Sequence, residues 1–334
     1  MAQTVLRFAD VGRDDVPLAG GKGASLGELL SAGIRVPDGY VVTTAAFRDA
    51  MGALAQDVER RVSALDPTDT PRLATAIAEI RARVQSAPPP SAVAVRSSAT
   101  SEDSAEASFA GLQDTYLWVH GGQSVLDHVR RCWASLYSVE SVTYRLRRGI
   151  PETDLAMAVV VQQMVGSRSS GVMFTRSPLT GDRSVVAIDA SWGLGSAVVS
   201  GDVTPDAFVV SKVTGEIVRR TVSTKTRWHQ PDPGGHGVVE ADVPTNLRDV
   251  PSLSDDEITE LVAVARKVEA HYGCPQDNEW AVARTGSPGE IVFLLQSRPE
   301  TVWAEKDAAG RAAPAAQAFD HVFNALGGKR PSGG

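Results

Sequence analysis

Residues 20–47 read GGKGASLGELLSAGIRVPDGYVVTTAAF, and this stretch sets the pattern of the N-terminal part of the chain. A glycine-rich segment containing Lys22 comes first. Leucines then recur at helical spacing over residues 24–32, which predicts a helix. Residues 36–39 predict a turn, and residues 40–43 predict a short strand. This succession of glycine loop, helix and strand indicates a protein that mixes helices with a sheet.

The remaining chain continues the mixture. Helices are predicted over 45–65, 71–86 and 124–148, and short apolar runs bounded by turns predict strands at 92–95, 159–161, 171–174, 185–188, 207–210, 217–222, 280–283 and 291–295. Residues 225–250 are rich in Pro, Gly and His and predict a long loop. Ser254 and Glu257 form an S-x-x-E capping box, which predicts the start of a further helix.

From residue 156 onward, strands dominate. We therefore expect an α+β fold of two lobes, with residues 1–160 in the first, residues 161–303 in the second and a hinge near 160–165. Residues 304–334 are rich in Ala and end in Gly-containing sequence, which predicts a flexible tail.

The composition narrows the range of partners. The chain has 334 residues and a formal net charge of -7, so it is a poor general binder of nucleic acid, whose affinity comes mainly from neutralised phosphates. The N-terminus does not resemble a signal peptide, and no apolar run is long enough to cross a membrane. The two cysteines, Cys132 and Cys274, form no metal-binding pattern. We expect a cytoplasmic protein with reduced thiols and no membrane partner.

The first candidate for chemistry is the glycine-rich segment from Gly20 to Ser25. Glycines allow close approach to an anion, the following helix presents backbone amides, and Lys22 adds a positive charge. It is not a Walker A loop, because Gly23 follows the lysine where Ser or Thr is required. The alternative is an ordinary strand–helix turn with a surface lysine.

The second candidate is the stretch from Val95 to Gly111. Arg96 is predicted at the end of a strand and offers a planar fork for phosphate oxygens. Thr100, Ser108 and Gly111 belong to the small, hydroxyl-rich loop that follows, which is suited to act as a lid. The alternative is a Ser- and Thr-rich surface loop.

The third candidate combines Glu279 with Gln296 and Arg298. Two adjacent antiparallel strands can place Glu279 beside Gln296. Carboxylate and amide oxygens suit Mg²⁺, and Arg298 can neutralise the same polyphosphate. The alternative is a surface salt bridge between Glu279 and Arg298.

Several long motifs occur in a fixed order: the 20–47 stretch, AVRSSATSEDSAEASFAGLQDTYL, VVVQQMV, SGVMFTRSP, GLGSAVVSGDVTPD, DNEWA and LLQSRPET. Together they resemble the N-terminal ATP-binding domain shared by phosphoenolpyruvate synthase, pyruvate phosphate dikinase and rifampin phosphotransferase. The resemblance implies an ATP-grasp fold, with the nucleotide held between the two lobes.

The resemblance also implies roles for individual residues. Lys22, Arg96 and Arg298 would contact phosphates and act as the catalytic charges, while Thr100, Ser108 and Gly111 would cover them. Gln163, Met164 and Val165 would meet adenine at the hinge through backbone groups and an apolar wall. Glu279 and Gln296 would hold Mg²⁺. The family usually has glutamate where this chain has Ser196, which places the strength of metal or nucleotide binding in question.

The implied activity is that of a dikinase, in which ATP becomes AMP and phosphate. The β-phosphoryl group passes to a histidine of a separate domain and then to pyruvate, a phenol or another acceptor. None of the six histidines here has the surroundings of that histidine. We expect an ATP-binding subunit or domain that works with a separate subunit carrying the phosphohistidine and the acceptor site. The alternatives are a non-catalytic nucleotide-binding regulatory module, an ATP-grasp enzyme that transfers the γ-phosphoryl group, and a domain excised from a longer protein.

Overall fold

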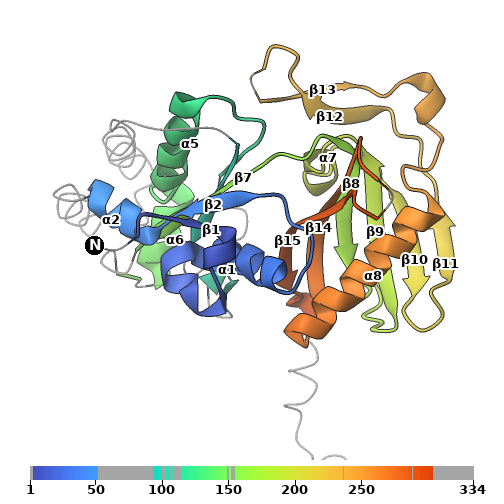
Figure 1. Ribbon diagram of the computed structural model, residues 1–334, viewed down its shortest axis with the longest axis horizontal. Helices are drawn as coiled ribbons and strands as arrows, with labels where there is room; N and C mark the ends of the chain where they lie inside the picture. The colour runs from blue at the N-terminus through green and yellow to red at the C-terminus, as the bar shows by residue number, and fades with distance from the viewer. Residues whose placement is uncertain are drawn as a thin grey trace, which may run out of the picture.

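The computed structural model shows two β-sheets side by side, each flanked by helices (Figure 1). The structure describes residues 3–51, 93–99, 103–104, 107–108, 114–148, 150–151, 155–235, 237–287 and 289–303. Helices and sheets occur in both halves of the molecule. This confirms the α+β class.

The N-terminal sheet has five strands in the order β1-β2-β7-β3-β6, and all neighbours are antiparallel. Its strands are β1 (Val5–Arg7), β2 (Gly39–Val42), β3 (Ala94–Ala99), β6 (Thr115–Tyr116) and β7 (Met157–Gln162). Central strand β7 is fully buried, as its continuous apolar run MAVVV predicts. It continues past the boundary expected at residue 160 and ends at Gln162.

Among the described residues, four helices and two short 3-10 turns accompany this sheet. They are η1 (Phe8–Asp10), η2 (Arg13–Asp15), α1 (Val16–Ser31), α2 (Thr44–Met51), α5 (Gly122–Ser135) and α6 (Val139–Arg148). A two-stranded ribbon, β4 (Asp103–Ser104) with β5 (Ala107–Ser108), stands apart from the sheet. The rest of the helices expected over 45–65 and 71–86 lies outside the described residues.

The single helix predicted over 124–148 is wrong, because the chain breaks between α5 and α6. Tight i→i−3 hydrogen bonds close residues 136–138, and the Ser138 hydroxyl accepts from the Ser141 amide at 3.1 Å. This serine caps the second helix as a hydroxyl does at many helix starts. The apolar residues keep their helical spacing across the break, so the sequence pattern does not reveal the break.

The C-terminal sheet has six strands in the order β11-β10-β9-β8-β14-β15. They are β8 (Ser167–Phe174), β9 (Val185–Trp192), β10 (Asp206–Ser211), β11 (Ile217–Thr221), β14 (Gln276–Ala283) and β15 (Val292–Pro299). The one-turn helix α7 (Ser196–Val199) and the longer α8 (Asp255–Tyr272) belong to this half. The capping box predicted at the start of α8 is confirmed, with Ser254 and Glu257 each bonded to the other's amide.

The long loop predicted over 225–250 is also wrong. It contains a two-stranded hairpin, β12 (Arg227–Pro231) with β13 (Val238–Asp242), and the turn η4 (Thr245–Leu247). Figure 1 shows this hairpin projecting beyond the sheet. Its polar residues are paired across the strands: Arg227 meets Glu240 and Asp242. A polar hairpin lacks the apolar alternation by which strands are recognised in sequence.

The glycine-rich segment lies inside α1 instead of preceding a helix. The helix begins at Val16 and is interrupted at Gly20, whose backbone is left-handed with φ 68°. A Cβ on Gly20 would lie 2.1 Å from the carbonyl oxygen of Ser98 in β3. The kink thus packs α1 directly against the strand that carries Arg96.

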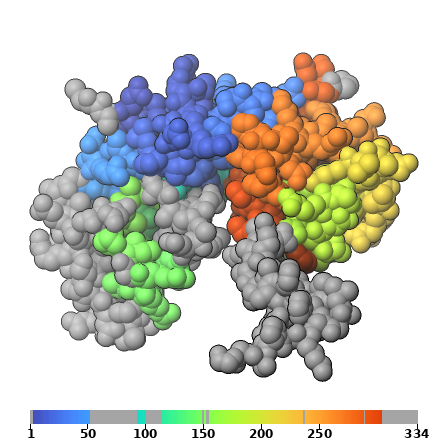
Figure 2. Space-filling view, turned by 90° about the horizontal axis from the view of Figure 1, so that it is seen from below, coloured from blue at the N-terminus to red at the C-terminus, as the bar shows by residue number. Residues whose placement is uncertain are grey.

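The two halves are joined along one side by α1 and α8. Glu28 accepts from the ring of His271 at 3.0 Å, and the Ser25 hydroxyl lies 3.3 Å from that of Tyr272. Lys267 donates to the carbonyl of Gly33 at 2.9 Å. Figure 2 shows the blue N-terminal residues directly against the orange residues of α8.

Candidate active site

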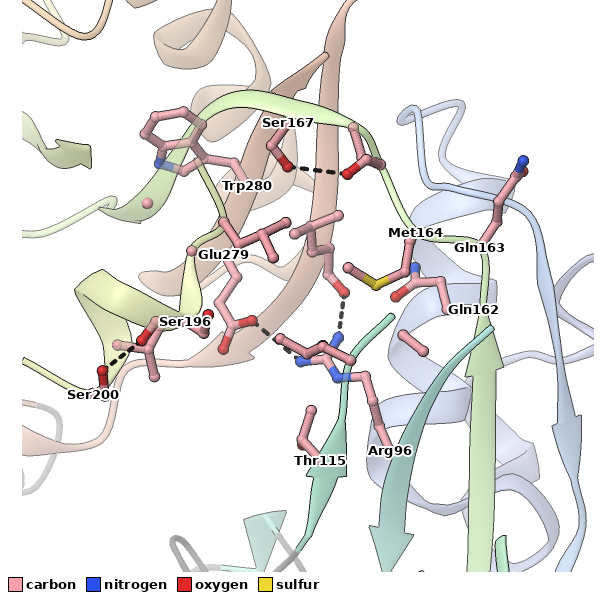
Figure 3. A pocket seen from close by; sticks show the side chains of 18 residues that line it. Arg96, Thr115, Gln162, Gln163, Met164, Ser167, Ser196, Ser200, Glu279 and Trp280 are labelled. Carbon is pink, nitrogen blue, oxygen red and sulfur yellow. Dashed lines mark hydrogen bonds and ion pairs between the residues drawn. The ribbon is translucent and has the colours of Figure 1, made fainter. Parts of the chain in front are cut away.

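A cavity of about 340 Å³ lies between the two sheets (Figure 3). β3, β6 and β7 form one side, and β8, α7, β14 and β15 form the other. The connection from β7 to β8 closes one end. Its lining residues are Ala94, Arg96, Thr115, Leu117, Gln162, Gln163, Met164, Val165, Ser167, Gly171, Leu194, Gly195, Ser196, Val199, Ser200, Glu279, Trp280 and Leu295.

Arg96 links the two sheets at this cavity. It lies within β3, which runs on to Ala99, so the prediction that it ends a strand is wrong. Its guanidinium donates to Glu279 at 3.2 Å, to the amide oxygen of Gln296 at 2.5 Å and to the carbonyl of Leu295 at 3.0 Å. Arg96 is only 8% exposed, so its charge is held by these partners and not by water.

Glu279 and Gln296 stand directly opposite each other on β14 and β15, as the spacing predicted. One residue later the register shifts, and Leu295 has no partner. This β-bulge turns the Leu295 carbonyl toward Arg96. Two oxygens from adjacent strands therefore converge on a single cationic group.

Arg298 does not pair with Glu279. It is exposed and lies 3.5 Å from Asp277, its direct neighbour across the strands. Neither residue lines the cavity. Arg298 therefore forms its surface salt bridge with Asp277 and not with Glu279. The Asp277–Arg298 pair lies two residues along the strands from the Glu279–Gln296 pair.

Burial raises the pKa of Asp277 to about 6, and the nearby positive charge of Arg298 only partly opposes this effect. One carboxylate oxygen, Oδ1, is buried without a hydrogen-bond partner. The strand pair β14–β15 thus includes a carboxyl group that is costly to ionise in the absence of further cations.

The predicted hinge residues connect β7 to β8 at the cavity's end. The backbone N–H of Gln163 donates to the backbone carbonyl of Asp38 at 2.7 Å, which fixes the connection against the N-terminal half. The Gln163 side chain points away from the other labelled residues, whereas Met164 faces them (Figure 3). Met164 and Val165 supply apolar wall and leave backbone groups at the edge of the cavity.

Lys22 lies just beyond the kink in α1 and is not among the residues that line the cavity. Burial raises the pKa of the neighbouring Cys132 thiol, and the charge of Lys22 acts in the opposite direction. The backbone amide of Gly23, within the glycine-rich segment, donates to the hydroxyl of Ser98 at 3.2 Å. The structure brings Lys22 to the N-terminal sheet near Arg96's strand but not into the cavity.

Ser196 begins α7 and lines the cavity. Its hydroxyl lies 2.9 Å from Nδ1 of His229, and Nε2 of this histidine lies 3.6 Å from Asp202. The position at which the sequence departs from the family pattern is therefore part of the site. Its polar partner comes from the β12–β13 hairpin, which the sequence did not predict.

Some predicted site residues lie outside the described residues. They are Thr100, Gly111 and the side chain of Ser108, together with the tail 304–334. The sequence also missed residues that the structure places in the cavity wall, namely Gln162, Leu194, Trp280 and Leu295. All four lie within or next to quoted motifs. Strand alternation alone does not show which neighbours face a cavity between two sheets.

The fold and the site define a class: an α+β protein of two antiparallel sheets, with a cavity between them that offers apolar walls and one cluster of charged and amide groups. Residues 16–93 and 83–318 match the family described as pyruvate phosphate dikinase, AMP/ATP-binding domain. The chain belongs to this family.

Similarity to individual proteins supports the same family membership. The chain is 43% identical to the probable phosphoenolpyruvate synthase of Methanothermobacter thermautotrophicus over 91% of its own length and 47% of the relative's. It is also 43% identical to a rifampicin phosphotransferase of Streptomyces sp, over 89% of this chain and 36% of the relative. It is 39% identical to the phosphoenolpyruvate synthase of Aeropyrum pernix, over 93% of this chain and 44% of the relative. The chain thus spans less than half of each of these relatives.

No helix in the described ranges combines the length and the apolar character needed to span a bilayer. Within the same part of the chain, no three or more His, Cys, Asp or Glu side chains gather closely enough to hold a metal ion.

Proposed function

We propose that this chain is the ATP-grasp nucleotide module of a dikinase-type phosphotransferase. The observation that carries the proposal is the meeting of Arg96, Glu279 and Gln296 at a cavity whose far end is formed by Met164 and Val165. An apolar end beside a charged cluster suits a base at one side and phosphates at the other. Adenine would lie against the hinge, and the β- and γ-phosphates toward Arg96, Lys22 and Arg298.

The donor set fits Mg²⁺. Glu279 and Gln296 already direct their oxygens at one positive group, the Arg96 guanidinium. Carboxylate and amide oxygens are suitable ligands, and these two residues would hold the ion. Bound Mg²⁺ would neutralise charge on the phosphates during transfer. Arg96 would then turn from its protein partners to phosphate oxygens, which a guanidinium binds with the same fork.

The protein's own part in the reaction is positioning and charge neutralisation, because phosphoryl transfer needs little covalent help from the enzyme. In the proposed reaction the β-phosphoryl group of ATP passes to a histidine on a separate subunit or domain, AMP leaves, and the γ-phosphoryl group is transferred to water and released as phosphate. That histidine then phosphorylates pyruvate, a phenol or another acceptor. The relatives named phosphoenolpyruvate synthase and rifampicin phosphotransferase support a phosphotransferase role.

The first prediction concerns Lys22. Replacing it by alanine removes a charge-assisted phosphate contact worth about 1.5–3 kcal/mol, so the Kd for Mg-ATP should rise about ten- to hundredfold. Calorimetric titration of the wild type and of Lys22→Ala measures this. Lys212→Ala is the matched control, because Lys212 pairs with Glu269 and neither residue lines the cavity. Equal affinity in Lys22→Ala would remove Lys22 from the site.

A second function is favoured by Ser196 alone. The loss of a carboxylate at this position would suit a regulatory module that binds ATP and does not turn it over. The two functions differ in product: with a histidine-bearing partner and an acceptor, a dikinase module forms AMP. Binding of Mg-ATP without AMP under any such pairing would favour the regulatory module, and ADP as the product would contradict both.

A further inference from the structure

A histidine of the β12–β13 hairpin lies behind a serine of the cavity wall. The hydroxyl of Ser196, at the start of α7, lies 2.9 Å from Nδ1 of His229 in β12. Ser196 lines the cavity, whereas His229 does not. The mechanism proposed above uses neither side chain. A serine hydroxyl within hydrogen-bond reach of an imidazole nitrogen is the arrangement that activates serine as a nucleophile.

The backbone holds the two residues together. The N–H of Leu194, just before α7, donates to the backbone carbonyl of His229 at 2.9 Å. Gly193 has a left-handed backbone with φ 79°, and a Cβ at this position would lie 2.4 Å from the same carbonyl oxygen. The turn before α7 is therefore in direct contact with β12, and this contact keeps His229 next to Ser196.

A carboxylate orients the imidazole. Nε2 of His229 lies 3.6 Å from the carboxylate of Asp202. The ring nitrogen that faces a carboxylate carries the proton more favourably, so Nδ1 is left to accept the proton of the Ser196 hydroxyl. The charge of Asp202 would also stabilise the imidazolium that this transfer forms. Ser196, His229 and Asp202 thus supply a nucleophile, a base and a carboxylate in series.

A second cavity, of about 480 Å³, adjoins the first at Ser196. His229 lines this second cavity, and its side chain is 17% exposed. A proton taken by His229 therefore has a route to water that does not cross the cavity proposed for ATP.

Ser196 also lies toward the end where the proposed function places the phosphates. It belongs to the side of the cavity that carries Glu279, whereas Met164 lies at the hinge end (Figure 3). With adenine against Met164, the phosphates point toward the cluster that contains Glu279. A nucleotide bound in this direction presents its terminal phosphate to the side of the cavity that carries Ser196.

We propose that Ser196 is a site of self-phosphorylation, at which it accepts the γ-phosphoryl group of ATP with His229 as the general base. Oγ of Ser196 forms a bond to the γ-phosphorus while the bond from that phosphorus to the β,γ-bridging oxygen breaks. ADP leaves with the electron pair of the broken bond, and the hydroxyl proton moves to Nδ1 of His229. The inference rests on the proposed function, which supplies bound ATP. The reaction ends once Ser196 is occupied, so it differs from catalytic turnover to ADP.

The test follows the γ-phosphoryl group. The wild type is incubated with Mg-ATP that carries a radioactive label in the γ-phosphoryl group, without a partner subunit or acceptor, and mass spectrometry of its peptides locates the modification. We expect acid-stable label on Ser196, because phosphoserine survives acid and phosphohistidine does not. The rate per chain should not change on dilution of the protein, because donor and acceptor belong to one molecule.

Two variants and a control assign the roles. Ser196→Ala should take up no label. His229→Gln keeps a side chain that can form a hydrogen bond but supplies no base, so the initial rate should fall about hundredfold or more. Ser184→Ala should take up label like the wild type, because Ser184 is exposed, bonds to Asp182 and lines neither cavity. Calorimetry with Mg-ATP and thermal unfolding show whether each variant keeps its fold and its nucleotide site.

Several results would overturn the assignment: label on another residue, acid-labile label, uptake that persists in Ser196→Ala, an undiminished rate in folded His229→Gln, or a rate per chain that falls on dilution. The position of the label in the wild type decides the matter even if a variant does not fold. A wild type that binds Mg-ATP and takes up no label would also overturn it and would leave the proposed function standing. If the wild type did not bind Mg-ATP, the proposed function would fail, and the role of Ser196 with it.

Discussion

Two buried cationic side chains, those of Arg96 and Lys225, differ in the groups that hold them. The Arg96 guanidinium donates to the two side chains that the proposed function gives to Mg²⁺, so under that proposal its partners change during binding. Lys225 is different. It is fully buried and donates to Asp206 at 2.6 Å and to the carbonyl of Ser223 at 2.8 Å. Asp206 also accepts from the Ser252 amide and hydroxyl, so this network is closed within the C-terminal half.

We expect Lys225→Met to destabilise the fold by roughly 3–5 kcal/mol, because it leaves the Asp206 carboxylate buried without its counter-charge. Denaturant unfolding monitored by circular dichroism measures the loss. Lys212→Met is the control, since the Lys212–Glu269 pair is nearer to solvent and should give a smaller loss. Equal losses of unfolding free energy in the two variants would show that the deeper burial of the Lys225–Asp206 pair does not increase its contribution to stability.

At the scale of elements, the kink in α1 positions the glycine-rich segment. Gly20 has φ 68° and packs against Ser98, whose hydroxyl donates to the carbonyl of Ala19 and accepts from the amide of Gly23. A helix without this break would not meet β3 in the same way. The conformation and the close approach both require glycine here.

Gly20→Ala should therefore be destabilising on two grounds: about 1–2 kcal/mol for the left-handed backbone and roughly 1–3 kcal/mol for the steric conflict with Ser98. Gly273→Ala separates them, because Gly273 has φ 69° and nothing within 4 Å of the added carbon. Thermal unfolding of both variants gives the comparison. A Gly20→Ala loss no greater than that of Gly273→Ala would mean that the packing of the kink contributes nothing.

At the scale of the whole molecule, the contact between α1 and α8 holds the two sheets on either side of the cavity. Glu28 of α1 is its ionic centre, meeting His271 at 3.0 Å and Arg13 at 3.2 Å. Burial raises the pKa of Glu28, but the bonds from His271 and Arg13 and their charges outweigh this effect. The pKa lies below its ordinary value of 4.5.

The sign of the pH dependence follows. A carboxyl group whose pKa is lowered by folding stabilises the protein above its ordinary pKa, and the contribution is lost as pH falls through the lowered value. The stability advantage of the wild type over Glu28→Gln should shrink between about pH 5 and pH 3. Unfolding free energies at several pH values measure it.

Glu260 of α8 supplies a control of opposite sign. Burial raises the pKa of this carboxyl group, against the charge of Arg35. The wild type should therefore gain on Glu260→Gln as pH falls, because protonation is easier in the folded state. If both variants changed in the same direction with pH, the ionisation of Glu28 at this interface would not explain the result.

The sequence by itself determined the elements that have strong local patterns. The S-x-x-E box and its apolar spacing were sufficient for α8, and apolar runs located the strands of the C-terminal sheet. The distance between Glu279 and Gln296 along the chain was sufficient to predict that they stand opposite each other. These predictions succeed because a helix or a pair of neighbouring strands is decided by residues close in sequence.

Only the tertiary structure decided the rest. It brought Arg96 of one sheet against Glu279, Gln296 and the Leu295 carbonyl of the other, replaced the expected Glu279–Arg298 pair with Asp277–Arg298, and placed His229 next to Ser196. It also folded residues 227–242 into a hairpin. The contacts of Arg96 join residues 183 to 200 positions apart, so local periodicity carries no trace of them. The polar hairpin lacks the apolar alternation by which strands are recognised in sequence.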